Sequence, residues 1–253
     1  MPPLVSLRGI VKSYANGVVA LDGLDIDVSE GEFVSLLGPS GCGKSTALRI
    51  LAGLSEPSAG QVEWRDGVAA RRQLGFVFQE PTLMPWASVA DNVRLPLRLA
   101  GEGVTESASR VAEALARVGL APFAEAYPRE LSGGMKMRVS IARALVTSPA
   151  LLLMDEPFAA LDEITRFKLN DDLIALKHAL GKTVVFVTHS VFESVYLSTR
   201  IVVMTPRPGR VATVLTIDAP QPRDARFRTS AEYAAFCRMT SDALAAAMME
   251  GAA

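Results

Sequence analysis

Two glycine motifs and one pair of carboxylates are the residues of this chain with the clearest chemistry. The first motif reads GPSGCGKST at 38–46 and fits the phosphate-loop pattern G-x-x-x-x-G-K-[ST]. Its glycines let backbone N–H groups face phosphate oxygens, Lys44 reaches the β- and γ-phosphates, and Ser45 places its hydroxyl on Mg²⁺. An apolar, strand-like run at 33–37 precedes the loop and a helical stretch at 47–54 follows it. These flanks favour a nucleotide site over a simple glycine-rich turn.

Asp155 and Glu156 follow a second apolar run, LLLM at 151–154. Neighbouring side chains of an extended chain point to opposite faces, so Asp155 can hold Mg²⁺ through water while Glu156 polarises the attacking water as general base. The alternative is an Asp-Glu-Pro turn that merely ends a core strand, and the phosphate loop in the same chain favours the catalytic interpretation. With LSGGM at 131–135, the pattern predicts ATP hydrolysis shared between two subunits.

The elements that must position these residues alternate along the chain, which is typical of α/β folds with a central sheet. Strands are predicted at 4–7, 25–28, 33–37, 76–78, 151–154, 183–187, 201–204 and 211–217. Helices are predicted at 47–54, 108–118, 136–146, 164–180 and 232–249, with a turn at 206–209. His178 lies in the fourth of these helices and is expected to be a surface or packing residue.

In this order, and over nearly the whole chain, the motifs resemble the ATP-binding subunits of ABC transporters. The resemblance implies a single ABC ATP-binding domain over 1–253, an α/β fold with a P-loop NTPase core at about 1–80 and 150–210. It further implies an antiparallel β subdomain, a helical subdomain at about 81–149 that contains the signature motif, and a C-terminal strand and helix extension at about 211–253.

The resemblance also implies roles for single residues. Tyr14, in KSYANG, matches the aromatic residue that stacks on adenine; a core ring is its alternative. Gln79, in FVFQE, matches the Q-loop glutamine that touches Mg²⁺ and the attacking water, with an exposed strand-end glutamine as the alternative. His189, after the run 183–187, matches the H-loop histidine that contacts the γ-phosphate and helps position Glu156.

The segment LSGGM resembles the family signature LSGGQ, whose serine and glycine N–H groups bind the γ-phosphate of ATP held by the opposite subunit. The helix start favours anions, although a serine N-cap followed by flexible glycines is the alternative. Met135 replaces the usual glutamine, and Ala159 replaces the usual leading serine of the D-loop at 159–162.

The candidate residues therefore divide by role. The expected catalytic residues are Lys44, Gln79, Glu156 and His189. The expected Mg²⁺ ligands are Ser45, Gln79 and Asp155. The expected nucleotide contacts are Tyr14, Gly38, Pro39, Ser40, Gly41, Cys42, Gly43, Lys44, Ser45 and Thr46, with Ser132, Gly133 and Gly134 acting on the nucleotide of the other subunit.

A tryptophan-bearing loop, PTLMPW at 81–86 followed by VADNV at 89–93, resembles the branch of importers for nitrate, sulfonate, taurine and related compounds. The LSGGM variant, FAALDEITR at 158–166 and PRPGR at 206–210 suit the same branch. An exposed loop with Met84 and Trp86 could receive a short permease helix, because aromatic residues are favoured at such anchors; a tryptophan packed inside its own subdomain is the alternative.

Composition limits the partners. The net charge of −1 gives no electrostatic case for nucleic acid, and the two cysteines, one inside the phosphate loop, favour a reducing compartment. The sequence has no apolar run long enough to span a bilayer, so membrane attachment is expected through a permease, with a solute-binding protein indirectly involved. One ATPase copy implies a homodimer at the cytoplasmic face of the membrane. A soluble ABC ATPase, a nucleotide-sensing regulatory subunit and a phosphate-loop kinase are the alternatives.

Overall fold

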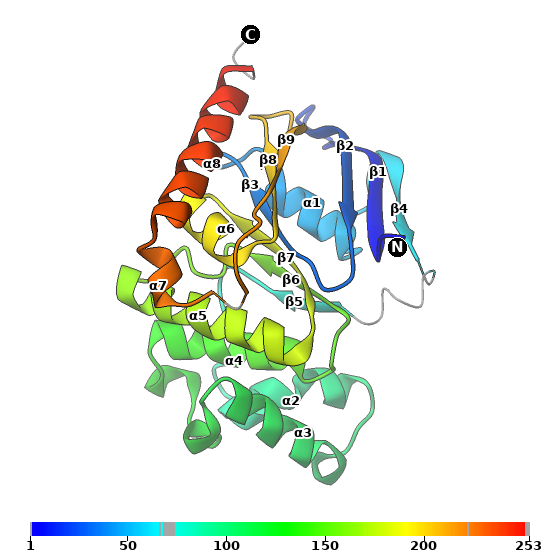
Figure 1. The fold of residues 1–253 in the computed structure, drawn as a ribbon. Helices are drawn as coiled ribbons and strands as arrows, with labels where there is room; N and C mark the ends of the chain where they lie inside the picture. The colour runs from blue at the N-terminus through cyan, green and yellow to red at the C-terminus, as the bar shows by residue number, and fades with distance from the viewer. Residues whose placement is uncertain (1, 66, 68–73, 222, 251–253) are drawn as a thin grey trace.

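Two β-sheets, with helices between and around them, form the computed structural model, which describes residues 2–65, 67, 74–221 and 223–250 (Figure 1). The larger sheet has the strand order β5-β6-β7-β3-β8-β9 and is parallel except for β9, which runs antiparallel to β8. Its strands are β3 (Phe33–Leu37), β5 (Leu74–Val77), β6 (Leu151–Asp155), β7 (Thr183–Thr188), β8 (Arg200–Met204) and β9 (Val211–Thr216). The smaller, antiparallel sheet comprises β1 (Val5–Ser13), β2 (Val19–Val28) and β4 (Ala59–Trp64), in the order β2-β1-β4. The α/β class and the antiparallel sheet are as predicted.

The helices lie on both faces of the larger sheet. They are α1 (Lys44–Leu51), α2 (Val89–Leu99), α3 (Val104–Arg117), α4 (Gly133–Leu145), α5 (Glu163–Leu180), α6 (Val191–Leu197), α7 (Ala225–Arg228) and α8 (Ala231–Glu250), with short 3₁₀ turns at Ala121–Phe123 and Pro128–Glu130. Figure 1 shows α1 between the two sheets, α4 and α5 on the other face, and α2 with α3 beyond them. Helix α8 packs along α6, β8 and β9.

The central strands carry apolar side chains on both faces because both faces are covered. All five residues of β3 are buried. Val34 and Leu36 belong to the core that contains Leu48 of α1, whereas Phe33 and Leu37 belong to the core on the opposite face. Continuous apolar runs rather than alternating ones are what such a sandwiched sheet requires, which explains why 33–37, 151–154 and 183–187 were recognisable as strands.

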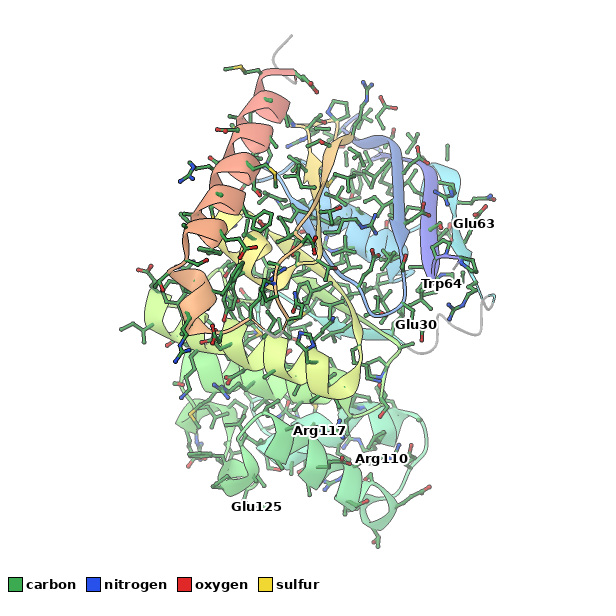
Figure 2. The ribbon with its side chains drawn as sticks, in the orientation of Figure 1. Glu30, Glu63, Trp64, Arg110, Arg117 and Glu125 are labelled. Carbon is green, nitrogen blue, oxygen red and sulfur yellow. The ribbon has the colours of Figure 1, made fainter. Side chains whose placement is uncertain are left out.

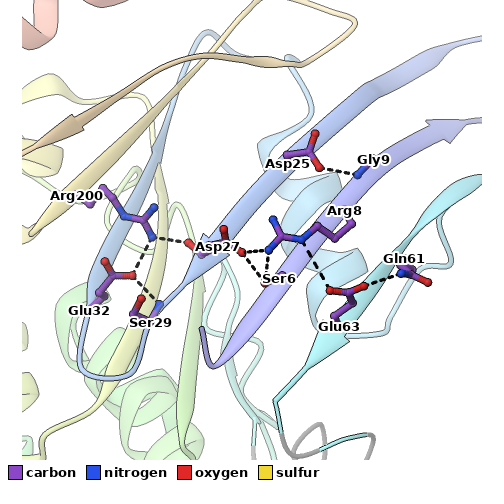
Figure 3. Close-up of polar contacts among 10 residues, drawn as sticks. All are labelled: Ser6, Arg8, Gly9, Asp25, Asp27, Ser29, Glu32, Gln61, Glu63 and Arg200. Carbon is purple, nitrogen blue, oxygen red and sulfur yellow. Dashed lines mark hydrogen bonds and ion pairs between the residues drawn. The ribbon is translucent and has the colours of Figure 1, made fainter. Parts of the chain in front are cut away.

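Polar contacts fasten the small sheet to the large one (Figure 3). Arg200, on β8, donates to the backbone carbonyl of Asp27 on β2 and pairs with Glu32, just before β3, at 2.8 Å. On the small sheet itself, Arg8 of β1 pairs with the Asp27 carboxylate at 2.6 Å. These contacts fix where β1 and β2 lie relative to β3, and therefore where the β1–β2 turn with Tyr14 lies relative to the loop after β3.

The helices between β5 and β6 form a layer at one end of the molecule. Figure 2 labels Arg110 and Arg117 on α3, and Glu125 beyond it, at the end of the structure opposite Glu63 and Trp64 of β4. Within this layer α2, α3 and α4 pack on one another, and α4 also packs on β5. The layer is thus anchored to the central sheet through α4.

Several elements differ from the sequence prediction, each for a local reason. The stretch 89–93, expected as part of a loop, begins α2 instead, where the Ser88 side chain caps the helix by accepting from Asp91 N at 3.1 Å. Pro96 lies inside α2, and because proline is disfavoured in helix interiors, the sequence gives a weak helical signal there. Strand β4 has no buried residue and so gives no apolar pattern. The predicted strand 211–217 is β9, which joins the central sheet as its edge strand.

Candidate functional site

The phosphate loop leaves β3 and enters α1 at Lys44, three residues earlier than the predicted helix start. Gly43 caps the helix with a φ of 106°, and a Cβ there would lie 2.7 Å from the carbonyl oxygen of Ala20. A Cβ on Gly38 would lie 2.9 Å from Sγ of Cys42. Both positions need glycine, one for its backbone angle and both for space, so that the loop can wrap tightly in front of the helix N-terminus.

Lys44 is the cation of this loop and is only 3% exposed. Its Nζ donates to the carbonyl oxygens of Gly38 at 2.8 Å and Pro39 at 2.9 Å, and lies 3.7 Å from Oε1 of Glu156. The ammonium is therefore held inside the loop by groups that a phosphate can replace, because carbonyl oxygens are weaker partners than an anion.

Ser45 and Asp155, the expected Mg²⁺ ligands from two separate motifs, meet directly: the Ser45 hydroxyl donates to Oδ1 of Asp155 at 2.6 Å. Asp155 is 6% exposed, and burial raises the pKa of its carboxyl group. Within the described part of the chain, no lysine or arginine forms an ion pair with it. A hydroxyl and a buried carboxylate without a cationic partner fit Mg²⁺, which takes one or two protein oxygens and completes its shell with water and phosphate.

Glu156 faces a different way from Asp155, but not for the predicted reason. Its φ of 44° lies in the left-handed region, so the chain turns at Glu156 instead of continuing extended. Its backbone N–H still donates to Val187 of β7 at 3.0 Å. The turn brings Oε2 to 3.2 Å from Nδ1 of His189, at the end of β7. Glu156 thus lies between Lys44 and His189.

An open cavity of about 220 Å³ lies over these groups and is bounded by ten residues. They are Tyr14, Val18, Ala20, Gly41, Gly43, Lys44, Ser45, Thr46, Glu156 and Arg207. Tyr14 is 43% exposed and so is not a core ring; its hydroxyl lies 3.4 Å from Oγ1 of Thr46. The Lys12 ammonium lies 5.4 Å from the centre of the Tyr14 ring. Flat aromatic surface and phosphate loop therefore share one cavity.

Several predicted site residues do not line this cavity. Asp155 and His189 contact it only through Ser45 and Glu156, and Gly38, Pro39, Ser40 and Cys42 are also absent from its lining. Gln79 and the signature residues do not line it either.

Gln79 is exposed, two residues beyond the end of β5. Ser132 caps α4 by accepting from Met135 N at 3.3 Å, as the capping alternative predicts. A Cβ on Gly134 would lie 2.7 Å from Cγ2 of Thr165 on α5, so this glycine lets the two helix starts approach closely. The signature segment of the chain does not line the cavity over its own phosphate loop.

Val18, Ala20 and Arg207 line the cavity but were not predicted as site residues. Val18 and Ala20 carry no chemical signal in the sequence. Arg207 does: PRPGR at 206–210 follows β8, which is the parallel neighbour of β3. Parallel neighbours end at the same edge of a sheet, so the turn after β8 was bound to lie beside the phosphate loop.

Outside the cavity, Trp86 is 77% exposed, so the alternative of a packed indole is wrong. Met84, two residues before it, is half-buried, and its N–H donates to Oδ1 of Asn92 at 2.7 Å. The loop is therefore fixed to α2 while its indole is presented outward. His178 is exposed on α5, with Nε2 2.7 Å from the side-chain amide of Gln221. Cys42 and Cys237 are both free and buried.

Comparisons with known proteins show the family to which this chain belongs. A family described as "ABC transporter" matches residues 21–159. The aliphatic sulfonates import ATP-binding protein SsuB 1 of Pseudomonas syringae pv. syringae is 47% identical, over 88% of this chain and 90% of its own length. The taurine import ATP-binding protein TauB of Rhizobium johnstonii is 48% identical, over 81% of this chain and 79% of its own length. A solved ATP-binding cassette, dimeric in a post-hydrolysis state with ADP and Pi, is 35% identical with a TM-score of 0.73, over 85% of this chain and all of that one.

This chain belongs to the ABC transporter ATP-binding proteins and is an ATPase of that family. The family membership overturns the phosphate-loop kinase alternative. In the ranges that the structure describes, no helix is long and apolar enough to cross a membrane.

Proposed function

We propose that two copies of this chain bind Mg-ATP between them and couple its hydrolysis to the import of a small solute through a separate permease. The observation that carries the catalytic part is the unbroken set of contacts from Lys44 through Glu156 to His189 beside the phosphate loop. Hydrolysis is transfer of the γ-phosphoryl group to water, for which positioning and electrostatic stabilisation supply most of the catalysis.

Phosphate binding is the first task of the site. The backbone N–H groups of 41–46 surround the phosphates at the start of α1, and Lys44 exchanges its two carbonyl partners for phosphate oxygens. Ser45 and Asp155 would hold Mg²⁺, with Gln79 joining when its exposed side chain turns inward. The metal supplies charge neutralisation of the phosphates, and Tyr14 supplies a face for adenine stacking.

Glu156 acts on the attacking water. While Lys44 lies 3.7 Å from Oε1, that oxygen is attracted to the ammonium; when phosphate draws Lys44 away, Oε1 is free to accept a proton from water. The hydrogen bond between Nδ1 of His189 and Oε2 of Glu156 remains and fixes the orientation of the carboxylate. His189 is half exposed, which leaves its ring able to contact the γ-phosphate.

A second copy is needed because the signature segment does not reach the cavity of its own chain. Ser132, Gly133 and Gly134 form the N-terminus of α4, where N–H groups and the helix dipole favour an anion. Placed over the cavity of another copy, this helix start would contact the γ-phosphate and complete the site. The cassette bound to ADP and Pi, to which this chain is similar, is dimeric, which supports the need for a second copy.

The transport assignment rests on relatives and on one surface feature. The relatives named as importer subunits for aliphatic sulfonates and taurine support a sulfonate solute. Nitrate enters the proposal only through the resemblance of the loop at 81–93 to the wider importer branch. The outward-facing Trp86 is suited to a groove for a permease helix, since large aromatic side chains are favoured interface anchors. The chain would then attach peripherally to the cytoplasmic face, and a solute-binding protein would meet only the permease.

The transport proposal is tested by tagging the chain, extracting it gently from its native membranes without ATP, and identifying its partner by mass spectrometry. A stoichiometric integral-membrane permease is expected. A chain that stays in the soluble fraction without a membrane partner would leave the ATPase standing and overturn the transport role. That result would favour the soluble ATPase or the regulatory subunit instead.

The surface feature has its own test. Trp86→Ala should leave basal ATPase activity of the isolated chain unchanged within about twofold and weaken co-purification of the permease about tenfold or more, as interface hot spots do. Met249→Ala is the matched control, because Met249 is also 77% exposed but lies in the last turn of α8. Equal permease recovery with both variants would remove Trp86 from the interface.

A further inference from the structure

The turn at 205–210, between β8 and β9, is the part of the cavity wall that the phosphate-loop and carboxylate motifs do not explain. It is fastened to β2: the Gly209 N–H donates to Ala20 at 2.9 Å, and the Gly209 carbonyl accepts from Asp22 N at 3.2 Å. A Cβ on Gly209 would lie 2.1 Å from the carbonyl oxygen of Cys42. The turn is therefore pressed against the backbone of the phosphate loop, with no room for movement towards it.

Arg207 is presented to the cavity by this rigid turn. Its Nε donates to the carbonyl oxygen of Gly41 at 3.3 Å, and one terminal nitrogen would lie 3.3 Å from a Cβ built on Gly41. Across the described ranges, no carboxylate forms an ion pair with Arg207. A guanidinium has five N–H donors in a planar fork. Most of these donors are therefore unused beside the cavity, and the charge is uncompensated.

The position of Arg207 along the loop indicates which part of a nucleotide it would meet. The Tyr14 hydroxyl lies at Thr46, the last residue of the motif, which places the base-stacking surface at that end. Arg207 lies at Gly41, five positions earlier, among the N–H groups that surround phosphates. The guanidinium is thus on the phosphate side of the cavity rather than the base side.

We propose that Arg207 is a second cationic contact, besides Lys44, for the phosphate chain of bound ATP. The proposal rests on the proposed function, because it needs nucleotide in this cavity. The charge of Lys44 is partly offset by Glu156, whose Oε1 lies 3.7 Å from its Nζ. Arg207 would add a positive charge that no ion pair offsets among the residues that the structure describes. Guanidinium groups bind phosphate oxygens through short, often bidentate, charge-assisted hydrogen bonds. An exposed contact of this kind is weakened by salt.

The test is nucleotide affinity measured by isothermal titration with ATP, ADP and GTP, at low and high salt. Arg207→Ala should raise the dissociation constant for ATP about tenfold, which is about 1.4 kcal/mol. GTP should be affected by the same factor, because the contact is to phosphate, and the salt dependence of binding should become shallower. Arg207→Lys keeps the charge without the fork and should recover part of the affinity.

Arg210→Ala is the matched control, because Arg210 belongs to the same turn but pairs with Asp22 and does not line the cavity. It should bind ATP like the wild type. Equal loss of ATP affinity in Arg207→Ala and Arg210→Ala would overturn the proposal. Unchanged ATP affinity in a folded Arg207→Ala chain would also overturn it, and so would a loss of affinity for ATP without a loss for GTP. Failure of the wild-type chain to bind any nucleotide would instead overturn the proposed function itself.

Discussion

The phosphate loop and the signature segment are both glycine-rich and both lie at a helix N-terminus, yet the chain completes only one of them. Around the phosphate loop, residues from β6, β7 and the β8–β9 turn converge within hydrogen-bond or ion-pair distance of one another. Around Ser132, the contacts are those of an ordinary helix cap and of close packing against α5. The first is a candidate site closed within one chain; under the proposed function, the second would need groups from another chain to close it.

Two similar glycine-rich helix starts therefore differ in function according to which other groups of the fold lie beside them. A helix start favours an anion, and further groups around it close the site. For 38–46 those groups come from the same sheet edge, because β3, β6, β7 and β8 are parallel and end together. For 131–135 no such edge exists, and a second molecule is the simplest source of the missing wall.

Substitution of Lys44 should have the largest effect on nucleotide binding and turnover, because it disrupts the site that one chain completes. Lys44→Ala removes the buried ammonium. In the wild type, phosphate oxygens would replace the carbonyl oxygens that this ammonium contacts. Nucleotide binding should fall about a hundredfold and turnover below detection, since charge-assisted hydrogen bonds are each worth about 1.5–3 kcal/mol. Titration with ATP and a phosphate-release assay measure both. Normal turnover in a folded variant would remove the phosphate-loop assignment.

Glu156→Gln separates binding from chemistry at the same site. The amide keeps the shape of the side chain but cannot accept a proton from water, so hydrolysis should fall about 10²–10⁴-fold while ATP affinity is retained. ATP should then hold the variant as a dimer, visible by light scattering. A variant that stays monomeric under saturating ATP would count against the shared site.

Complementation tests the comparison directly. Gly134→Ala should bind ATP normally but lose at least tenfold of its ATPase activity, because the new methyl group would lie 2.7 Å from Thr165 and displace the helix start. Mixed with Lys44→Ala chains, half of the dimers would contain one intact phosphate loop facing one intact signature. About a quarter of wild-type activity should return if one such site suffices. No recovery would contradict a shared site of which one intact copy suffices.

Asp155→Asn should change the nucleotide-free protein least, and it should raise its stability although it removes an expected Mg²⁺ ligand. Burial raises the pKa of Asp155, so the folded chain binds this proton more tightly than the unfolded chain does. The nucleotide-free protein therefore loses stability as pH rises above the ordinary value of 3.8, until the folded carboxyl is also ionised.

An asparagine keeps an oxygen for the Ser45 hydroxyl and carries no charge to bury. The melting temperature of the Asp155→Asn variant at neutral pH should rise by a few degrees, and its dependence on pH should flatten. Mg²⁺-dependent ATP binding should be lost at the same time. A lower melting temperature together with intact Mg-ATP binding would contradict both parts, and scanning fluorimetry over a pH series makes the measurement.

The sequence predicted the central strands well and missed β4, α2 and α6. Strands 33–37, 151–154 and 183–187 were recognisable because both faces of the central sheet are covered, which leaves continuous apolar runs. Strand β4 was missed because none of its residues is buried, and α2 because Pro96 interrupts its pattern. Tertiary pairing with β1 and packing on α4 stabilise these two elements without leaving a local signal.

Residue types and spacing alone determined that this chain carries a phosphate loop, an acidic strand end and a signature-like helix start, since each needs a fixed local order of side chains. Only the tertiary structure decided how they meet. The turn at Glu156, with its φ of 44°, separates that carboxylate from Asp155. The parallel pairing of β3 with β8 brings Arg207 to Gly41 across more than 160 residues. Such neighbours are set by which strands end at one edge of the sheet, and no short stretch of sequence encodes that.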